Sequence, residues 1–297
     1  MGFFFEVLIG GLLSGVMYSL VALGFVLIYK ASGVLNFAQG SLVFFAALTF
    51  VGLMEHHLSF GAALVVTLLV MIAAGLAIER FVLRPLVNQP QISLFMATIG
   101  LSFFIEGLAQ LVWGASVRGL DLGIQDEPIA WISDRTGMSV SKFDLMAAGI
   151  AAALVAVLAL FFNRTRIGRA LRAVADDHQA ALAVGIPLQQ IWGIVWAVAG
   201  FVALVTGLLW GARNGVQFAL TFVALKALPV LILGGFESIP GAIVGGLIIG
   251  ATEKLAEVFV GPYFGGGIEG WFPYVLALLF LLVRPEGLFG EKIIRRI

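Results

Sequence analysis

RTRIGRALRAVADDHQAALAVGIP, residues Arg164 to Pro187, is a polar segment between two long apolar runs. Its first half is rich in arginine, and short loops dense in lysine and arginine stay on the cytoplasmic side of a bilayer. Apolar positions recur from Leu171 at helical spacing, and Gly185 followed by Pro187 is typical of a helix end. The segment therefore predicts a short amphipathic helix on the inner surface of a membrane, and it orients the apolar runs on either side.

The composition predicts a polytopic membrane protein. Hydrophobic residues make up 61% of the 297 and charged residues 11%, whereas about 25% of residues are charged in soluble domains. The net charge is zero and no basic tract is dense, which argues against nucleic-acid binding. Cysteine is absent, which excludes disulfides and cysteine metal sites. The N-terminal run lacks a basic leader, so we expect the first helix to be retained rather than cleaved as a signal peptide.

Nine apolar stretches approach the length of a membrane-crossing helix. They are residues 7–29, 35–54, 60–83, 93–113, 144–162, 191–211, 218–235, 241–260 and 271–283. The last stretch is short for a span and could instead re-enter the membrane. Three pairs of glycines, each four residues apart, predict close packing between these helices: Gly11 and Gly15, Gly241 and Gly245, and Gly246 and Gly250.

The distribution of lysine and arginine supports this threading. Predicted cytoplasmic segments hold Lys30, Arg80, Arg84, Arg164, Arg166, Arg169, Arg172, Arg284, Lys292, Arg295 and Arg296. Predicted external segments hold only Arg118, Arg135, Lys142 and Arg213. The asymmetry predicts a single all-α membrane domain over residues 1–297, with the N-terminus outside and the C-terminus cytoplasmic. Residues 114–143 would form an external loop and residues 164–189 a cytoplasmic one.

Polar side chains within the predicted spans are the candidates for a translocation path. A charge there costs about 2.5 to 3.5 kcal/mol on insertion scales, so it needs a partner or water. One set repeats every four residues along one helix face: Thr98, Ser102, Glu106 and Gln110. Lys226 and Glu253 have similar predicted depths, so we expect an ion pair, with Glu106 as the second candidate partner of Lys226.

Each of these groups also has a structural interpretation. The polar stripe could serve only to hydrogen-bond neighbouring helices. Lys226 could extend to the membrane surface along its own stem, and Glu253 could lie at an exposed helix end. The turn from Gly33 to Ser41, with Asn36 and Gln39, is either a buried break whose free backbone groups face a cavity or a hairpin at the surface.

Enzyme signatures are missing from the sequence. It has no HExxH, no GxSxG and no GxxxxGK[ST] phosphate loop. We therefore expect no catalytic residue, no metal site and no cofactor on this chain. If it pumps a solute with ATP, the nucleotide must be hydrolysed on a separate subunit.

Three stretches resemble, in order and spacing, the LivH-type inner-membrane permeases of branched-chain amino acid ABC importers. They are GLLSGVMYSLVALGFVLIYKASGVLNFAQG at 11–40, RTRIGRALRAVADDHQAALAVGI at 164–186 and ALKALPVLILGGFESIPGAIVGG at 224–246. The resemblance runs over nearly the whole chain. Two departures bear on the solute, because relatives also carry urea, short amides or other amino acids: Gln39 replaces a position that is often histidine, and Glu237 stands in a turn that usually has a small residue.

The resemblance implies a subunit of a bacterial inner-membrane importer for leucine, isoleucine and valine. Such a subunit pairs with a second similar permease as a heterodimer, sits on two cytoplasmic ATPases and receives its solute from a periplasmic binding protein. The acidic external loop, with Asp121, Asp126, Glu127 and Trp131, would offer a docking face to that protein.

The cytoplasmic segment would be the coupling helix that receives the motion of the ATPases. Its candidate residues are Arg169, Leu171, Arg172, Asp176, Asp177, Leu182 and Gly185. Two other classes stay open from the sequence. A self-sufficient channel or ion-coupled carrier would bind its ion at Glu106 and Lys226, and a membrane enzyme would need catalytic groups that the sequence does not assemble.

Overall fold

The computed structural model describes residues 2–86, 89–176 and 178–290, which form helices joined by turns and loops. No strand occurs among the described residues, which form two isolated β-bridges, Arg118 with Val216 and Pro128 with Ser141. The prediction of an all-α protein is confirmed. Contacts divide the chain into two compact units. The first comprises the N-terminal residues up to Leu23, Leu122–Ala156 and the chain after Leu225, and the second comprises Gly24–Asp121 and Val157–Leu225.

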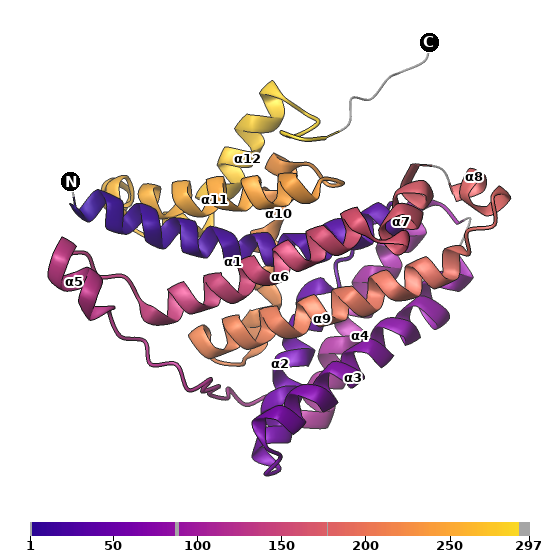
Figure 1. Cartoon of the computed structure of the whole chain (residues 1–297), viewed down its shortest axis with the longest axis horizontal. Helices are drawn as coiled ribbons and strands as arrows, with labels where there is room; N and C mark the ends of the chain where they lie inside the picture. The colour runs from indigo at the N-terminus through magenta and orange to yellow at the C-terminus, as the bar shows by residue number, and fades with distance from the viewer. Residues whose placement is uncertain (1, 87–88, 177, 291–297) are drawn as a thin grey trace. The chain divides into compact units, whose positions relative to one another are not determined.

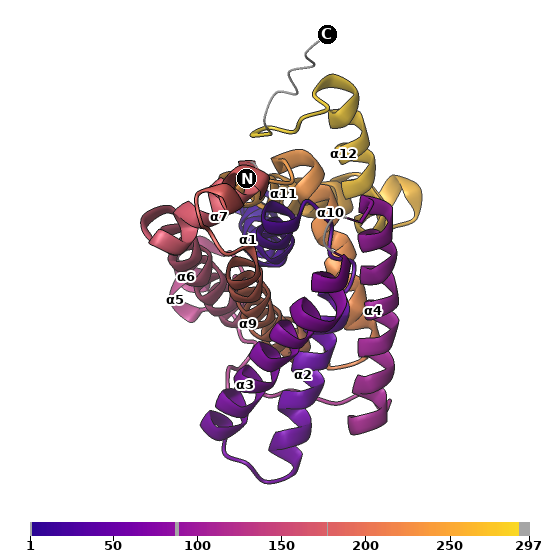
Figure 2. The same cartoon turned by 90° about the vertical axis from the view of Figure 1, so that its right-hand side faces the viewer.

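The second unit is built around α2 (Gln39–Glu55), which is mostly buried. It packs against α3 (Phe60–Ile78), α4 (Gln91–Trp113) and α9 (Leu188–Asn214), as Figure 2 shows. The helices approach closely where glycine removes the side chain. A Cβ added to Gly75 of α3 would lie 2.7 Å from the Trp196 carbonyl oxygen of α9, and one added to Gly207 of α9 would lie 2.6 Å from the Val43 carbonyl of α2.

In the first unit, the N-terminal part of α1 (Gly2–Ser32) runs beside α11 (Ile239–Phe259) (Figure 1). Glycines line both sides of this contact. A Cβ on Gly11 would lie 2.7 Å from the Gly250 carbonyl oxygen, and one on Gly15 would lie 2.5 Å from the Gly246 carbonyl oxygen. The close packing predicted from the glycine spacing is confirmed for these two pairs. The third pair also packs, against the backbone of α10 (Val223–Gly234).

The remaining elements are the long helix α6 and a set of shorter helices. They are η1 (Glu79–Leu83, a π-helix), η2 (Arg84–Leu86), α5 (Ala130–Thr136), α6 (Lys142–Arg164), α7 (Arg166–Asp176), α8 (His178–Ala183), η3 (Phe218–Phe222), η4 (Gly261–Phe264), η5 (Ile268–Gly270) and α12 (Phe272–Val283). The predicted coupling helix falls on α7 and α8, which the structure describes on either side of residue 177. The stretch predicted as one helix from residue 218 begins as the 3-10 helix η3 and becomes α-helical at Val223.

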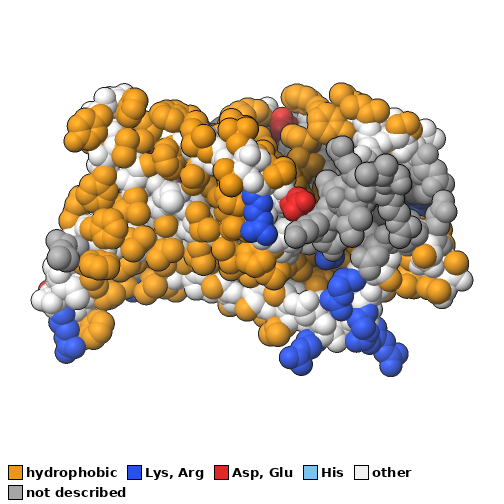
Figure 3. All heavy atoms as spheres, turned by 90° about the horizontal axis from the view of Figure 1, so that it is seen from above, with side chains coloured by type: hydrophobic (Ala, Val, Ile, Leu, Met, Phe, Trp, Pro, Cys, Tyr) orange, Lys and Arg blue, Asp and Glu red, His pale blue; other side chains and the backbone are white. Residues whose placement is uncertain are grey.

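Among the described residues, five helices are long and apolar enough to cross a bilayer: α1, α3 extended through η2, α4, α6 and α9. A sixth span arises if the pair 218–234 and 239–259, bent by 113°, counts as one. One predicted span is shorter than expected, because α2 begins only at Gln39, whereas α12, with 12 residues, is as short as the sequence indicated. The count of nine spans stays a prediction. Hydrophobic side chains cover most of the face in Figure 3, as expected for contact with lipid.

Candidate functional site

The break between α1 and α2 is held by its own polar side chains. Asn36 and Gln39 are both fully buried. The Asn36 side chain accepts a hydrogen bond from the Ala38 N–H (3.1 Å) and donates to Gln39 Oε1 (3.4 Å). The Gln39 amide lies against Gly24 of α1, where a Cβ would come within 2.6 Å of Nε2. The interpretation of this turn as a surface hairpin is therefore wrong: the break is buried in the protein.

The first residue of the polar stripe on α4 fastens this break. Thr98 Oγ1 lies 2.9 Å from the Phe95 carbonyl oxygen and 3.3 Å from that of Leu35, and it accepts a hydrogen bond from the Phe37 N–H at 3.4 Å. Thr98 is 1% exposed. For Thr98, hydrogen bonding between α4 and the break therefore accounts for its polar contacts.

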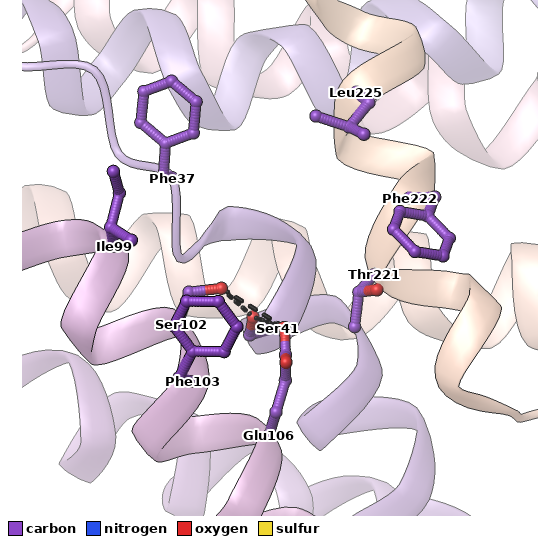
Figure 4. A pocket seen from close by; sticks show the side chains of 9 residues that line it. All are labelled: Phe37, Ser41, Ile99, Ser102, Phe103, Glu106, Thr221, Phe222 and Leu225. Carbon is purple, nitrogen blue, oxygen red and sulfur yellow. Dashed lines mark hydrogen bonds between the residues drawn. The ribbon is translucent and has the colours of Figure 1, made fainter.

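The next two residues of the stripe face a pocket of about 270 Å³ in the second unit. It is lined by Phe37, Ser41, Ile99, Ser102, Phe103, Glu106, Thr221, Phe222 and Leu225. Figure 4 shows the α4 side chains on one side, the 221–225 side chains opposite, and Ser41 between them on α2. Gln110, the last residue of the stripe, is half-buried and does not line this pocket.

One carboxylate organises the polar part of the pocket. Glu106 Oε1 accepts hydrogen bonds from Ser41 Oγ (2.8 Å) and Ser102 Oγ (3.2 Å), and the two hydroxyls lie 2.6 Å apart. Among the described residues, no lysine, arginine or histidine forms an ion pair with Glu106. The pocket therefore combines apolar walls with an acidic group for which the described part of the chain supplies no cationic partner.

Ser41 is a polar pocket residue that the sequence did not point to as a candidate, as is Thr221. Ser41 lies 65 residues from Glu106 in the chain, so no periodicity within one helix links them. The available signal was its place, two residues after Gln39, in the first turn of the helix that follows the polar break.

A second polar cluster lies in the first unit, on α1, α10 and α11. Lys226 Nζ lies 3.0 Å from Glu253 Oε1, and Tyr18 Oη donates a hydrogen bond to the same oxygen at 3.1 Å. Glu253 is 1% exposed, and its Oε2 has no hydrogen-bond partner among the described residues. The predicted pairing of Lys226 with Glu253 is confirmed, and the exposed helix end is wrong for Glu253. Tyr18 was missed, although Ser14, Tyr18 and Ser19 are polar residues in the middle of a mostly apolar predicted span.

Comparison with known proteins places these features in a family. Residues 7–284 match the model of the branched-chain amino acid transport system permease component. The chain belongs to this family. It is similar to the high-affinity branched-chain amino acid transport system permease LivH of Escherichia coli K12, with 27% identity over 99% of this chain and 98% of that protein. It is 29% identical to BraD of Pseudomonas aeruginosa, a protein of the same description, with the same coverage.

A more distant relative is the fructose import permease protein FruG of Bifidobacterium longum. It is 25% identical to this chain over 84% of the chain and 74% of its own length. Relatives of this permease are therefore named for chemically different solutes.

The candidate coupling segment of the permease lies in α7 and α8. Thr165 Oγ1 accepts a hydrogen bond from the Gly168 N–H (3.1 Å), which caps the start of α7. Leu171 and Val174 are 1% and 0% exposed, so the apolar face of α7 packs inside the permease. Leu182 and Val184, by contrast, are 55% and 76% exposed. Gly185 has a positive φ of 85° just beyond α8, which agrees with the predicted helix end.

These positions correct one sequence inference. Leu171 was predicted to receive the motion of the ATPases, but it is buried within the permease itself and is therefore not presented to a partner. Arg172 Nη1 donates to the Phe162 carbonyl (3.0 Å) and to Asn163 Oδ1 (3.4 Å), so it joins α7 to the end of α6. Arg169 is exposed. Asp177 and the C-terminal Lys292, Arg295 and Arg296 lie outside the described residues, and the Asp176 side chain is likewise not described.

The predicted external loop of the permease includes the helix α5. Asp121, Asp126 and Glu127 are exposed, and Asp126 accepts a hydrogen bond from Ser141. Trp131 is 64% exposed, and the Arg135 guanidinium lies 4.8 Å from its ring centre. The loop therefore presents acidic and aromatic side chains to its surroundings.

Proposed function

We propose that this chain is the permease subunit of an ABC importer that translocates leucine, isoleucine and valine across a bacterial inner membrane. The observation that carries the proposal is the likeness to LivH and BraD, which extends over 99% of this chain. The pocket at Glu106 supports it, because apolar walls beside a few polar groups suit a small amphiphilic solute.

The proposal includes the assembly around this chain. The permease forms a single membrane domain of nine spans, with the N-terminus outside and the C-terminus in the cytoplasm, as the lysine and arginine distribution favours. It pairs with a second similar permease as a heterodimer and receives its solute from a periplasmic binding protein. Two cytoplasmic ATPases bind and hydrolyse the ATP, and this chain itself holds no cofactor.

The translocation path in this proposal follows the polar residues at the break and on the neighbouring helices. Ser102 and Glu106, with Ser41, contact the solute. Thr98, Asn36 and Gln39 hold the break beside the path, and Gln110, Lys226 and Glu253 complete the set of candidate residues. The last two are paired with each other, which favours a structural role.

The ATPases dock on the tip formed by Leu182, Val184 and Gly185. Leu182 and Val184 are the exposed large apolar side chains of this segment, and an ATPase cleft would remove them from water. Arg169 on α7 adds a positive charge. ATP-driven closure of the ATPases then moves the segment and switches the access of the path between the two sides.

Reconstitution tests the proposal. Liposomes would carry this chain with its partner permease and both ATPases, with ATP inside and leucine-loaded binding protein outside. We expect uptake of leucine, isoleucine and valine that stops when the ATPases are inactivated by substitution. Urea, acetamide and fructose serve as the comparison solutes.

Two results would contradict the proposal. Uptake by this chain alone, driven by an ion gradient, would establish the ion-coupled carrier instead. Uptake of urea, acetamide or fructose with no uptake of the three branched amino acids would keep the family and replace the solute.

A further inference from the structure

The surroundings of the Glu106 carboxylate favour the binding of a cation. It lies on α4, a candidate membrane span, and the pocket around it is lined by three phenylalanines, an isoleucine and a leucine. Two hydroxyls bind Oε1, but no basic side chain among the described residues pairs with the charge. A carboxylate without a cationic partner is costly in apolar surroundings, so its presence here favours a function at the pocket over packing alone.

We propose that Glu106 binds the α-ammonium group of the amino acid in transit. Ser41 and Ser102 orient the carboxylate, and the side chain of the solute lies against the apolar walls. A branched-chain amino acid matches both parts of the site, because it carries one ammonium group and one branched hydrocarbon side chain. This inference rests on the proposed function and names the site at which it operates.

A neighbouring cavity supplies a contrast. The groove between α3, η1 and α4 is larger, at about 510 Å³, and is lined only by alanine, isoleucine, phenylalanine, valine, glycine and leucine. It offers no side-chain group that could hold an ammonium or a carboxylate. Among these two cavities, only the one at Glu106 can distinguish an amino acid from a hydrocarbon.

Cysteine labelling tests the proposal directly, because the natural chain has no cysteine. Ile99→Cys places a thiol on the pocket wall, and Val117→Cys places one in an exposed loop away from it. The complete importer, held in nanodiscs, is treated with a small water-soluble methanethiosulfonate, and the labelling rate of this chain is measured. The competitors are leucine, isoamylamine, which keeps the ammonium, and isocaproate, which keeps the carboxylate but lacks the ammonium.

We expect leucine and isoamylamine to slow labelling at Ile99→Cys, and isocaproate to leave it unchanged. Adding Glu106→Gln should raise the leucine concentration for half protection roughly ten- to hundredfold, as expected for the loss of a charge-assisted hydrogen bond. Glu106→Asp should restore part of the protection, since it keeps the charge. Labelling at Val117→Cys should respond to none of the competitors.

Equal protection by isocaproate and leucine, or unchanged protection after Glu106→Gln, would overturn the ammonium site. So would a lack of protection by leucine in an importer that still takes up leucine, and in that case the proposed function would stand. If the unaltered importer takes up none of the three branched amino acids, the proposed function itself fails, whatever the labelling shows.

Discussion

Replacing Lys226 with methionine tests whether the buried ion pair stabilises the permease. Methionine keeps much of the length of the stem and removes the ammonium that lies 3.0 Å from Glu253 Oε1. The carboxylate would then be left 1% exposed, and the Tyr18 hydroxyl would be its only donor in the part of the chain that the structure describes. Its second oxygen, Oε2, already has no hydrogen-bond partner among the described residues, so no contact at that atom would compensate for the loss of the ammonium charge.

The expected magnitude follows from burial. Removing one member of a buried ion pair costs about 3 to 5 kcal/mol. The Lys226 side chain is 33% exposed, so water already solvates part of its charge and the cost falls to the lower end of this range or just below it. We expect Lys226→Met to lower the free energy of unfolding by about 2 to 3 kcal/mol. Glu253→Gln alone should cost about 1 to 2 kcal/mol, because it leaves the partly exposed ammonium unpaired.

The assay is a double-mutant cycle on the full chain. The free energy of unfolding is measured in mixed micelles by titration with a denaturing detergent for the native protein, both single variants and the double variant. The double variant should lose less than the sum of the singles by at least about 1 kcal/mol, because neither residue then leaves an unpaired charge. The charge swap, Lys226→Glu with Glu253→Lys, should recover part of the loss of either single reversal.

A neighbouring ion pair provides the control. Lys254 Nζ lies 2.8 Å from Glu269 Oε2, but both side chains are more than a third exposed. Exposed pairs couple by about 0.2 to 1 kcal/mol, so the same cycle there should give a smaller value. Additive effects of Lys226→Met and Glu253→Gln, within about 0.5 kcal/mol, would refute the reasoning and show that water solvates the lysine independently of the carboxylate.

Three further predictions concern packing, coupling and docking. Gly11→Ala should destabilise the permease by about 1 to 3 kcal/mol, because its Cβ would overlap the backbone of α11, whereas Gly10→Ala, which meets nothing within 4 Å, should change the free energy of unfolding by less than about 0.5 kcal/mol. Leu171→Asp should prevent folding, while Leu182→Asp should yield a folded permease whose ATPases hydrolyse ATP without leucine uptake; normal uptake by the latter would remove α8 from the docking surface. Glu127→Lys should weaken the stimulation of ATP hydrolysis by the binding protein at low salt, and the difference should shrink near physiological ionic strength, where screening acts over about 8 Å; an effect independent of salt would argue against electrostatic docking there.

Contacts could be predicted from the sequence where they depend on spacing within one helix or on the separation of two residues from one turn. Glycines four apart predicted the contact faces of α1 and α11, and the close approach of Gly15 to Gly246 is present. Counting residues from a turn placed Lys226 and Glu253 at one depth, which is sufficient to predict a pair on consecutive helices.

Prediction from sequence fails where the burial of a residue depends on which other element covers its helix. Leu171 and Leu182 have the same character and belong to one apolar pattern, yet one packs inside the permease and the other is exposed. Periodicity identifies an apolar face without saying whether the same chain or another protein buries it. Similarly, Ser41 and Glu106 meet only because α2 packs on α4 in one register, which a pattern within either helix does not contain.

Two of the carboxylates in candidate spans, Glu253 and Glu106, therefore differ in a way that composition does not predict. Glu253 is accompanied by a lysine and a tyrosine from its own unit, and its charge is compensated before any solute arrives. Glu106 lines a pocket, and the donors to it within the described residues are two hydroxyls. Because a compensated charge gains little from a cationic group and an uncompensated one gains much, the ammonium group of a solute should be held at Glu106 rather than at Glu253. Neutralising Glu253 should then act mainly on the free energy of unfolding, and neutralising Glu106 mainly on solute binding.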